Sequence, residues 1–222
     1  MDESVSDERS GSARWLTVHD DLLRGLTHAL SNRVGTIAAA SYLLASMPET
    51  VATAATTLRD ESDRLDGQLQ LLRLLPRRTD AANEPVVPTD MTTQACALLS
   101  YHPELGDIPI DTALDGDLQP AYADPTSTIL ALTVAIAAAQ RVAGPQGRVV
   151  VRIACDTECV RIIVTGNHAD RADNHVRDDA LLADVAAVRW LLASSGGHAT
   201  DEAGGVTLLL PTLQAARRAH RE

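Results

Sequence analysis

The sequence predicts an α+β protein with two parts: a helical hairpin that pairs with a second copy into a four-helix bundle, and a C-terminal two-layer α/β sandwich. Three observations lead to this prediction. Apolar residues recur at helical spacing through residues 14–76. A polar, proline-bounded linker follows at residues 77–84. Helical and β-branched segments then alternate over residues 85–213.

The hairpin is predicted from two apolar stripes separated by the short polar stretch SMPET at residues 46–50. With Leu23 as the first heptad position, the seam of the first helix is apolar except at Arg33. Its seam positions are Leu23, Leu26, Leu30, Arg33, Ile37, Ala40, Leu44 and Met47. In the second helix the repeat falls at Val51, Leu58, Leu65 and Leu72. Two helices alone cannot bury both flanks of such stripes, so a homodimer is expected.

The rest of the chain is expected to form a sheet covered by helices. Strands are predicted at residues 85–88, 108–114 and 204–211, a β-hairpin at 147–166, and helices at 91–99, 125–142 and 178–197. The acidic, small-residue-rich residues 1–13 are predicted to be a disordered leader. Residues 214–222 form a short basic tail, expected to be a solvated helix end.

Composition excludes several classes of function. The formal net charge of −11 argues against a nucleic-acid partner, which needs a basic face. No apolar run approaches the roughly 20 residues that span a bilayer, so no membrane partner is expected. The three cysteines form no even disulfide framework and no recognisable metal spacing. These features favour a cytoplasmic protein.

Three segments, in this order, resemble bacterial two-component histidine kinases. The run HALSNRVGTIAAASYLL, which begins at His28, is similar to the phosphoacceptor box H-x-L-x-N-x-[LV]-x-x-[IL]. Residues 114–153 are similar to the kinase run from the second sandwich strand through the N-box helix, and residues 185–211 to the kinase C-terminus. The resemblance covers the chain after residue 14. It implies a dimerising hairpin followed by a sandwich of the histidine-kinase ATPase type.

The sandwich departs from the family at the positions that bind nucleotide. In active kinases, asparagines of the N-box helix hold magnesium, but the matching positions are Val134 and Ala138, which offer no oxygen ligand. Thr165 and Gly166 stand where the family's D-x-G-x-G begins, and RDDALLADVAA replaces a glycine-rich lid. The resemblance therefore implies a degenerate ATPase domain without a cofactor, and magnesium is expected on a receiver partner instead.

The histidine region matches the family more closely. His28 takes the outward heptad position f, and the resemblance makes it the phosphoacceptor. Ala29 stands where the family carries an acid, whereas Asn32 fits the polar position four residues after the histidine. The implied function is a histidine phosphotransferase that relays phosphoryl groups between receiver-domain aspartates without ATP. The residues expected to contact the receiver are Arg24, Ser31, Asn32 and Arg33.

Alternatives remain open. Ala29 also suits a pseudokinase adaptor that binds a receiver or kinase and carries no phosphate. His19 is followed by an acid and competes with His28, although it lacks the downstream box. His168 and His175, with aspartates nearby, are a second alternative as metal ligands on a loop. A third alternative is residual ATP binding through an altered pocket.

Overall fold

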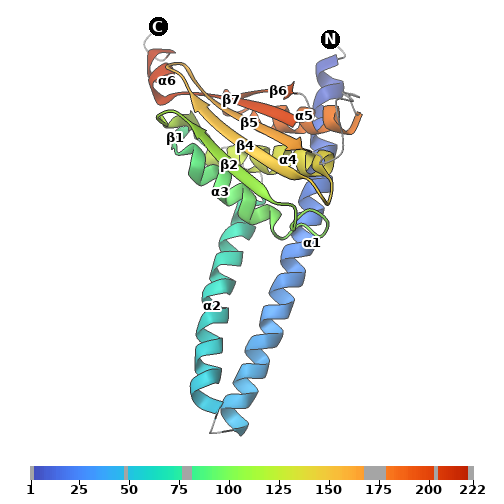
Figure 1. The fold of residues 1–222 in the computed structure, drawn as a ribbon, viewed down its shortest axis with the longest axis vertical. Coiled ribbons are helices and arrows are strands. Elements are labelled where there is room, and N and C mark those ends of the chain that lie inside the picture. Colours follow the sequence, from blue (N-terminus) through green and yellow to red (C-terminus); the bar gives the residue numbers. More distant parts are fainter. Residues whose placement is uncertain (1–2, 48–49, 77–81, 168–178, 203–204, 220–222) are drawn as a thin grey trace.

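A long helical hairpin projects from a mixed α/β unit (Figure 1). The structure is a computed structural model and describes residues 3–47, 50–76, 82–167, 179–202 and 205–219. Helix α1 spans Glu3–Ser46 and helix α2 spans Val51–Leu74. These elements confirm the predicted α+β class and the helical hairpin. The pairing of two hairpins into a bundle stays a prediction, because the structure contains one chain.

The α/β unit contains the predicted elements with small shifts in their ends. In chain order they are β1 (Glu84–Val86), α3 (Pro88–Leu99), β2 (Ile110–Asp115), β3 (Ala121–Ala123), α4 (Pro125–Ala143), β4 (Arg148–Cys155), β5 (Cys159–Asn167), α5 (Asp179–Leu192), β6 (His198–Glu202), β7 (Gly205–Pro211) and α6 (Leu213–Ala219). Strands β3 and β6 were not predicted from the sequence. Strand β6, HATDE, has little β-branched character and is formed through its pairing with β7.

The main sheet has the strand order β2-β4-β5-β7-β6. Only β2 and β4 run parallel, and the connection between them carries α4. The predicted β-hairpin of β4 and β5 is antiparallel, with Cys155 opposite Val160 next to its turn. Strands β1 and β3 form a separate two-stranded antiparallel sheet.

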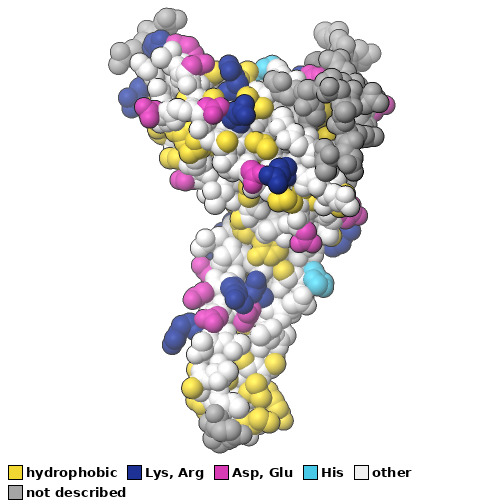
Figure 2. Space-filling view, in the orientation of Figure 1, with side chains coloured by type: hydrophobic (Ala, Val, Ile, Leu, Met, Phe, Trp, Pro, Cys, Tyr) yellow, Lys and Arg dark blue, Asp and Glu magenta, His cyan; other side chains and the backbone are white. Residues whose placement is uncertain are grey.

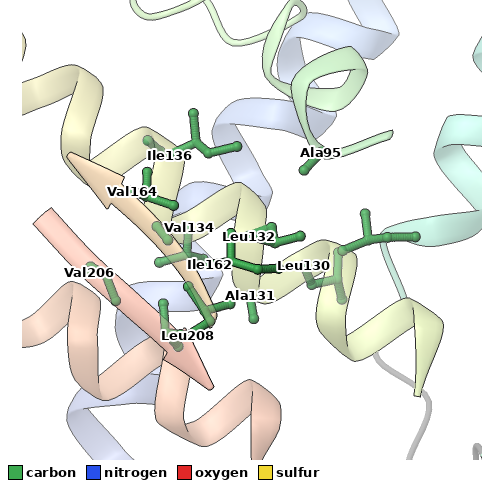
Figure 3. Packing of buried hydrophobic residues seen from close by; sticks show 14 of the residues in the cluster. Ala95, Leu130, Ala131, Leu132, Val134, Ile136, Ile162, Val164, Val206 and Leu208 are labelled. Atoms are coloured by element: carbon green, nitrogen blue, oxygen red, sulfur yellow. The ribbon is translucent and has the colours of Figure 1, made fainter. Parts of the chain in front are cut away.

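Helix α4 lies in the centre of the core and packs against the inward side chains of β5 and β7 (Figure 3). Asp124 caps its first turn, where the carboxylate accepts hydrogen bonds from the backbone N–H groups of Thr126 and Ser127 at 3.1 Å. By length and hydropathy, α4 would qualify as a membrane span. However, 83% of that segment is buried within the folded chain, as in the core helix of a globular unit.

The prediction of a disordered leader over residues 1–13 is wrong where the structure describes them. The chain is helical from Glu3. Trp15, Val18 and Leu22 continue this helix with a buried face that packs on the α/β unit, each at most 4% exposed. An acidic sequence thus becomes helical because its helix continues into a face that packs on α5. Tertiary packing outweighs composition here.

An ion-pair cluster ties this part of α1 to the α/β unit. The carboxylate of Asp184 on α5 is 2% exposed and lies 2.6 Å from Arg14 Nε and 2.7 Å from Arg141. The backbones also approach closely, because a Cβ on Gly11 would lie 2.6 Å from the carbonyl oxygen of Ala186. The N-terminal part of α1 is therefore fixed against α5, and α5 is linked to α4 through the same carboxylate.

The middle of α1 follows the predicted heptad assignment, whereas the ends of that stripe and α2 depart from it. Leu26 and Ala40 are buried, and Leu30, Arg33, Ile37 and Leu44 are half-buried. Leu23 of α1 is 40% exposed and Met47, directly after α1, is 42% exposed, whereas Leu22 is fully buried. The buried residues of α2 are Ala54, Glu61 and Gln68, each three positions after a predicted one. The heptad repeat shows which faces of a helix are apolar. It does not show which of these faces packs against the other helix of the same chain. In the predicted stripe of α2, Val51 is 45% exposed, and Leu58, Leu65 and Leu72 are half-buried.

Candidate functional site

His28 is an exposed residue of α1. One turn further along the helix, the side-chain amide nitrogen of Asn32 lies 3.4 Å from His28 Nδ1. Positions four residues apart are neighbours on a helix surface, so the helix itself brings the two side chains together. Ala29 is half-buried and offers no hydrogen-bonding group to the ring.

Arg24 and Ser31 share this exposed side. The Arg24 side chain is 72% exposed and pairs with Asp21 at 3.4 Å. The Ser31 hydroxyl donates to the carbonyl oxygen of Thr27 at 3.0 Å. Together with Asn32, these residues surround the imidazole with polar groups that a docked protein can reach.

Arg33 has a different position from the other residues expected to contact a partner. It points across the hairpin, where its guanidinium pairs with Glu61 of α2 at 2.9 Å. Glu61 is also held by Arg64 at 2.8 Å. The hydrogen bond from Arg33 is the main cause that lowers the pKa of the Glu61 carboxyl. Arg33 therefore holds the two helices together, and its expected contact with a partner stays a prediction.

A hollow of about 500 Å³ opens beside His28, between α1 and the loop that joins α3 to β2. Its lining residues are Arg24, Gly25, His28, Ser100, Tyr101, His102, Pro103, Gly106 and Asp107. The histidine thus stands at the junction of the hairpin and the α/β unit. A partner that reaches the ring from this side also meets the α3–β2 loop.

A buried imidazole shapes this loop. Nδ1 of His102 accepts backbone N–H groups from Glu104 at 3.2 Å and Leu105 at 3.3 Å. These donors assign the ring proton to Nε2, which faces the Asp21 carboxylate at 3.6 Å. Burial lowers the pKa of His102, and the charge of Asp21 opposes this only in part. The ring is therefore neutral and acts as a structural acceptor.

The loop is also attached to the other two helices that it meets. The side-chain amide of Gln68 on α2 donates to the Tyr101 hydroxyl at 3.2 Å. Gln140 of α4 donates to the carbonyl oxygens of Leu105 and Ile108 at 3.1 and 3.2 Å. The α3–β2 loop was not predicted as part of the site. Its only local signal is the stretch YHPELGD after a helix, and nothing in that stretch indicates its proximity to His28.

Val134 and Ala138, where the sequence resemblance predicts that magnesium ligands are missing, are buried in the apolar core. Val134 and Ala138 are at most 1% exposed, and Val134 belongs to the same buried cluster as Ile162 and Val164 (Figure 3). A Cβ on Gly166 would overlap the carbonyl oxygen of Ala139 on α4. Among the described residues, no group of three or more His, Cys, Asp or Glu side chains could hold a metal ion. The histidines at 168 and 175 lie outside the described residues.

His19 differs from His28 in its surroundings. Its side chain is 26% exposed and packs edge-on against Trp15, with ring centroids 5.6 Å apart. Asp20 lies 3.4 Å from its Nδ1. This ring is partly covered where α1 meets the α/β unit, so a docked protein has less access to it than to His28.

No protein-family model and no curated protein matches the chain. A bacterial phosphotransferase structure is similar, with 15% identity and a TM-score of 0.43, covering 88% of this chain and 96% of the other. The Acinetobacter baumannii histidine kinase AdeS has 12% identity and a TM-score of 0.43, covering 83% and 96%. The mycobacterial sensor histidine kinase MprB has 18% identity and a TM-score of 0.43, covering 59% and 98%. These neighbours are histidine kinases and a phosphotransferase, of the kind that the sequence resembles.

Proposed function

We propose that this chain is a cytoplasmic histidine phosphotransferase that relays phosphoryl groups between receiver-domain aspartates in a bacterial two-component phosphorelay, without ATP. The observation that carries the proposal is the placement of His28. Its imidazole is exposed on a helix fixed to the α/β unit, with Asn32 at its Nδ1 and a hollow beside it.

Phosphoryl transfer from a receiver requires of this chain mainly a nucleophile in the right position. A lone pair on the ring nitrogen attacks the phosphorus of a receiver's aspartyl phosphate. The N–P bond forms, the P–O bond to the aspartate breaks, and the carboxylate leaves with the electron pair. Phosphoryl transfer depends mainly on positioning and charge stabilisation, and the receiver contributes its own magnesium. The reverse step returns the phosphoryl group to another receiver.

Arg24, Ser31 and Asn32 are the proposed receiver contacts on α1, and they lie on the exposed side that carries His28. The Arg24 guanidinium can also approach a phosphoryl group on the ring, because it is one helical turn away. The α3–β2 loop offers the receiver a second contact across the hollow. Arg33 is left out of this set, since its charge pairs with Glu61.

The absence of ATP chemistry is part of the proposal. Val134 and Ala138 supply no oxygen ligand for a magnesium ion, and both are buried in the core. Mixing with ATP and magnesium is therefore expected to give no binding heat. A clear micromolar binding isotherm would support the alternative of residual nucleotide binding.

We also propose that the chain acts as a homodimer through the hairpin. Apolar side chains stay uncovered along it (Figure 2). The large ones that are at least 40% exposed in the hairpin, including the turn between α1 and α2, are Leu16, Leu23, Val34, Tyr42, Met47, Val51 and Leu69. A second hairpin would bury such a surface, as in a four-helix bundle. Sedimentation equilibrium is expected to give twice the mass of one chain, and a monomer at micromolar concentration would contradict the dimer.

The phosphotransfer proposal is tested with receiver domains of the source organism that carry labelled aspartyl phosphate. Wild-type chain is expected to acquire the label within minutes, and His28→Gln to lose it, because glutamine cannot form the N–P bond. His28 is exposed, so the variant is expected to fold. His19→Gln is the matched control on the same helix and should accept label as wild type does. Undiminished labelling of His28→Gln contradicts the assignment.

A non-catalytic adaptor is the second candidate, and Ala29 favours it because the family's acid is missing at this position. An adaptor would bind the receiver without acquiring label. The same assay therefore separates the two functions, provided that binding of the receiver is measured in parallel.

A further inference from the structure

We propose that His102 is a positioning residue for receiver docking: its Nδ1 closes the α3–β2 loop into the wall of the hollow beside His28, and a receiver that reaches His28 binds this wall. The inference rests on the proposed function, but closure of the loop can be measured without a receiver. His102 lies outside the sequence motif that identifies His28. The hydrogen bonds of the loop carry the proposal.

The α3–β2 loop turns around the side chain and the carbonyl group of His102. The ring Nδ1 accepts the backbone N–H groups of Glu104 at 3.2 Å and Leu105 at 3.3 Å. The carbonyl oxygen of the same residue accepts the N–H group of Gly106 at 3.1 Å. Pro103 has no N–H group to satisfy. One residue therefore accepts every backbone donor of the four residues that follow it.

This arrangement is the one in which asparagine and aspartate side chains close turns. Their side-chain oxygen accepts N–H groups a few residues further along the chain. Histidine Nδ1 is the same number of bonds from the backbone as that oxygen, so it can take the same position. Unlike the oxygen of asparagine, it accepts a hydrogen bond only while it is unprotonated.

The imidazole and one of its two donors are shielded from water. The His102 side chain is 5% exposed and Leu105 is 6% exposed. Without an acceptor, the Leu105 N–H group would be left unpaired inside the protein, which costs more than the loss of an exposed hydrogen bond. The other ring nitrogen, Nε2, faces the Asp21 carboxylate of α1 at 3.6 Å. The ring therefore closes the loop and also lies between the loop and α1.

Closure by His102 sets the shape of the hollow beside His28. Pro103, Gly106 and Asp107 come from this turn and line the hollow. A receiver has to bring its aspartyl phosphate within bonding distance of the His28 imidazole, and the hollow adjoins that imidazole. A docked receiver therefore covers the hollow and contacts the turn. If the turn opens, this contact is lost, whereas His28 keeps its place on α1.

Protonation of His102 is expected to open the turn, because a protonated Nδ1 has no lone pair to accept a hydrogen bond. The charged groups that act on the ring are Asp21 and Arg24 of α1, Glu104 of the loop and Arg141 of α4. Burial is the main cause that lowers the pKa of His102, and the Asp21 carboxylate opposes it. With a lowered pKa, the folded chain binds this proton less readily than the unfolded chain. The closed turn is therefore stable at neutral pH and weakens as the pH falls below about 6.5, the usual histidine value.

Backbone amide exchange of the full-length chain, followed by NMR, tests the closure directly. In wild type at neutral pH, the N–H groups of Glu104 and Leu105 are expected to be protected. His102→Leu removes the acceptor and is expected to lower this protection roughly tenfold. His102→Asn supplies an oxygen at the same position and is expected to keep it. At about pH 5 the protection is expected to fall in wild type but not in His102→Asn, because asparagine does not titrate.

Titration with a phosphorylated receiver tests the docking role. His102→Leu is expected to raise the receiver concentration that gives half-maximal labelling of His28 by roughly tenfold. The rate at saturating receiver is expected to stay within about twofold of wild type, because the attacking nitrogen belongs to α1. His102→Asn should restore the wild-type half-saturation. A variant that is merely unstable would lose maximal labelling without a change in half-saturation.

His198→Asn is the matched control, because it replaces an exposed histidine of β6 that does not line the hollow. It is expected to match wild type in both experiments. Unchanged protection in His102→Leu overturns the proposal. If exchange responds as expected but no receiver labels wild type, His102 still closes the loop, but the proposed phosphotransfer and the docking role fail together. If label transfers to His102→Leu with wild-type half-saturation, the phosphotransfer stands and this inference fails.

Discussion

Asp184→Ala is expected to lower the free energy of unfolding by about 3 kcal/mol, the largest effect that we predict for a single side chain. The Asp184 carboxylate is 2% exposed and holds two guanidiniums, Arg14 at 2.6 Å and Arg141 at 2.7 Å. Alanine leaves both cations close together without a counter-charge, at the junction of α1, α4 and α5. The two arginine side chains are 22% and 31% exposed, so water relieves part of the cost.

Chemical denaturation measures this change, and hydrogen exchange shows where it acts. Exchange is expected to rise in the upper part of α1, because this cluster ties it to the α/β unit. Leu182→Ala, at a 43% exposed position of the same helix, serves as the control and should cost less than about 1 kcal/mol. Equal stability of Asp184→Ala and wild type would contradict the importance given to the cluster.

Gly25→Ala is expected to destabilise the chain by about 1 to 3 kcal/mol, although alanine is the better helix former. A Cβ at this position would overlap the backbone carbonyl oxygen of Tyr101 in the α3–β2 loop. The loop must therefore move away from α1, which alters the hollow beside His28. Receiver-dependent labelling of His28 is expected to slow as a result.

Gly35→Ala is the matched comparison in the same helix. A Cβ at this position meets no atom within 4 Å, so the substitution is expected to stabilise by about 0.5 to 1 kcal/mol through helix propensity alone. The two substitutions therefore predict opposite signs in the same denaturation experiment. If both stabilise the chain, the loop does not hold its observed position against α1.

The elements with strong local patterns were predictable from the sequence. The hairpin helices and the β4–β5 hairpin follow directly from apolar periodicity and β-branched runs. The helical state of residues 3–13 was not, because an acidic composition favours disorder unless the helix continues into a face that packs, as it does through Trp15 and Val18. The short strand β6 likewise depends on its pairing with β7 rather than on its own residues.

In the candidate site too, some residues were predictable from the local sequence and others depend on the fold. His28 and Asn32 came from a local motif, and their proximity follows from helix geometry. Arg33 belongs to that motif too, but its direction depends on the position of Glu61 in the other helix. His102 and the rest of the α3–β2 loop are about 75 residues from His28 in sequence, and only the fold brings them to the same hollow. A sequence motif identifies the nucleophile but not the α3–β2 loop that lines the hollow beside it.

The most direct test of the central claim is to locate the phosphoryl group itself. The chain is incubated with a phosphorylated receiver, and separately with ATP and magnesium, and is then analysed by mass spectrometry under neutral conditions that preserve phosphoramidates. The account predicts one phosphoryl group on His28 after incubation with the receiver and none after incubation with ATP. A phosphoryl group on another residue, or phosphorylation of His28 by ATP alone, would contradict it.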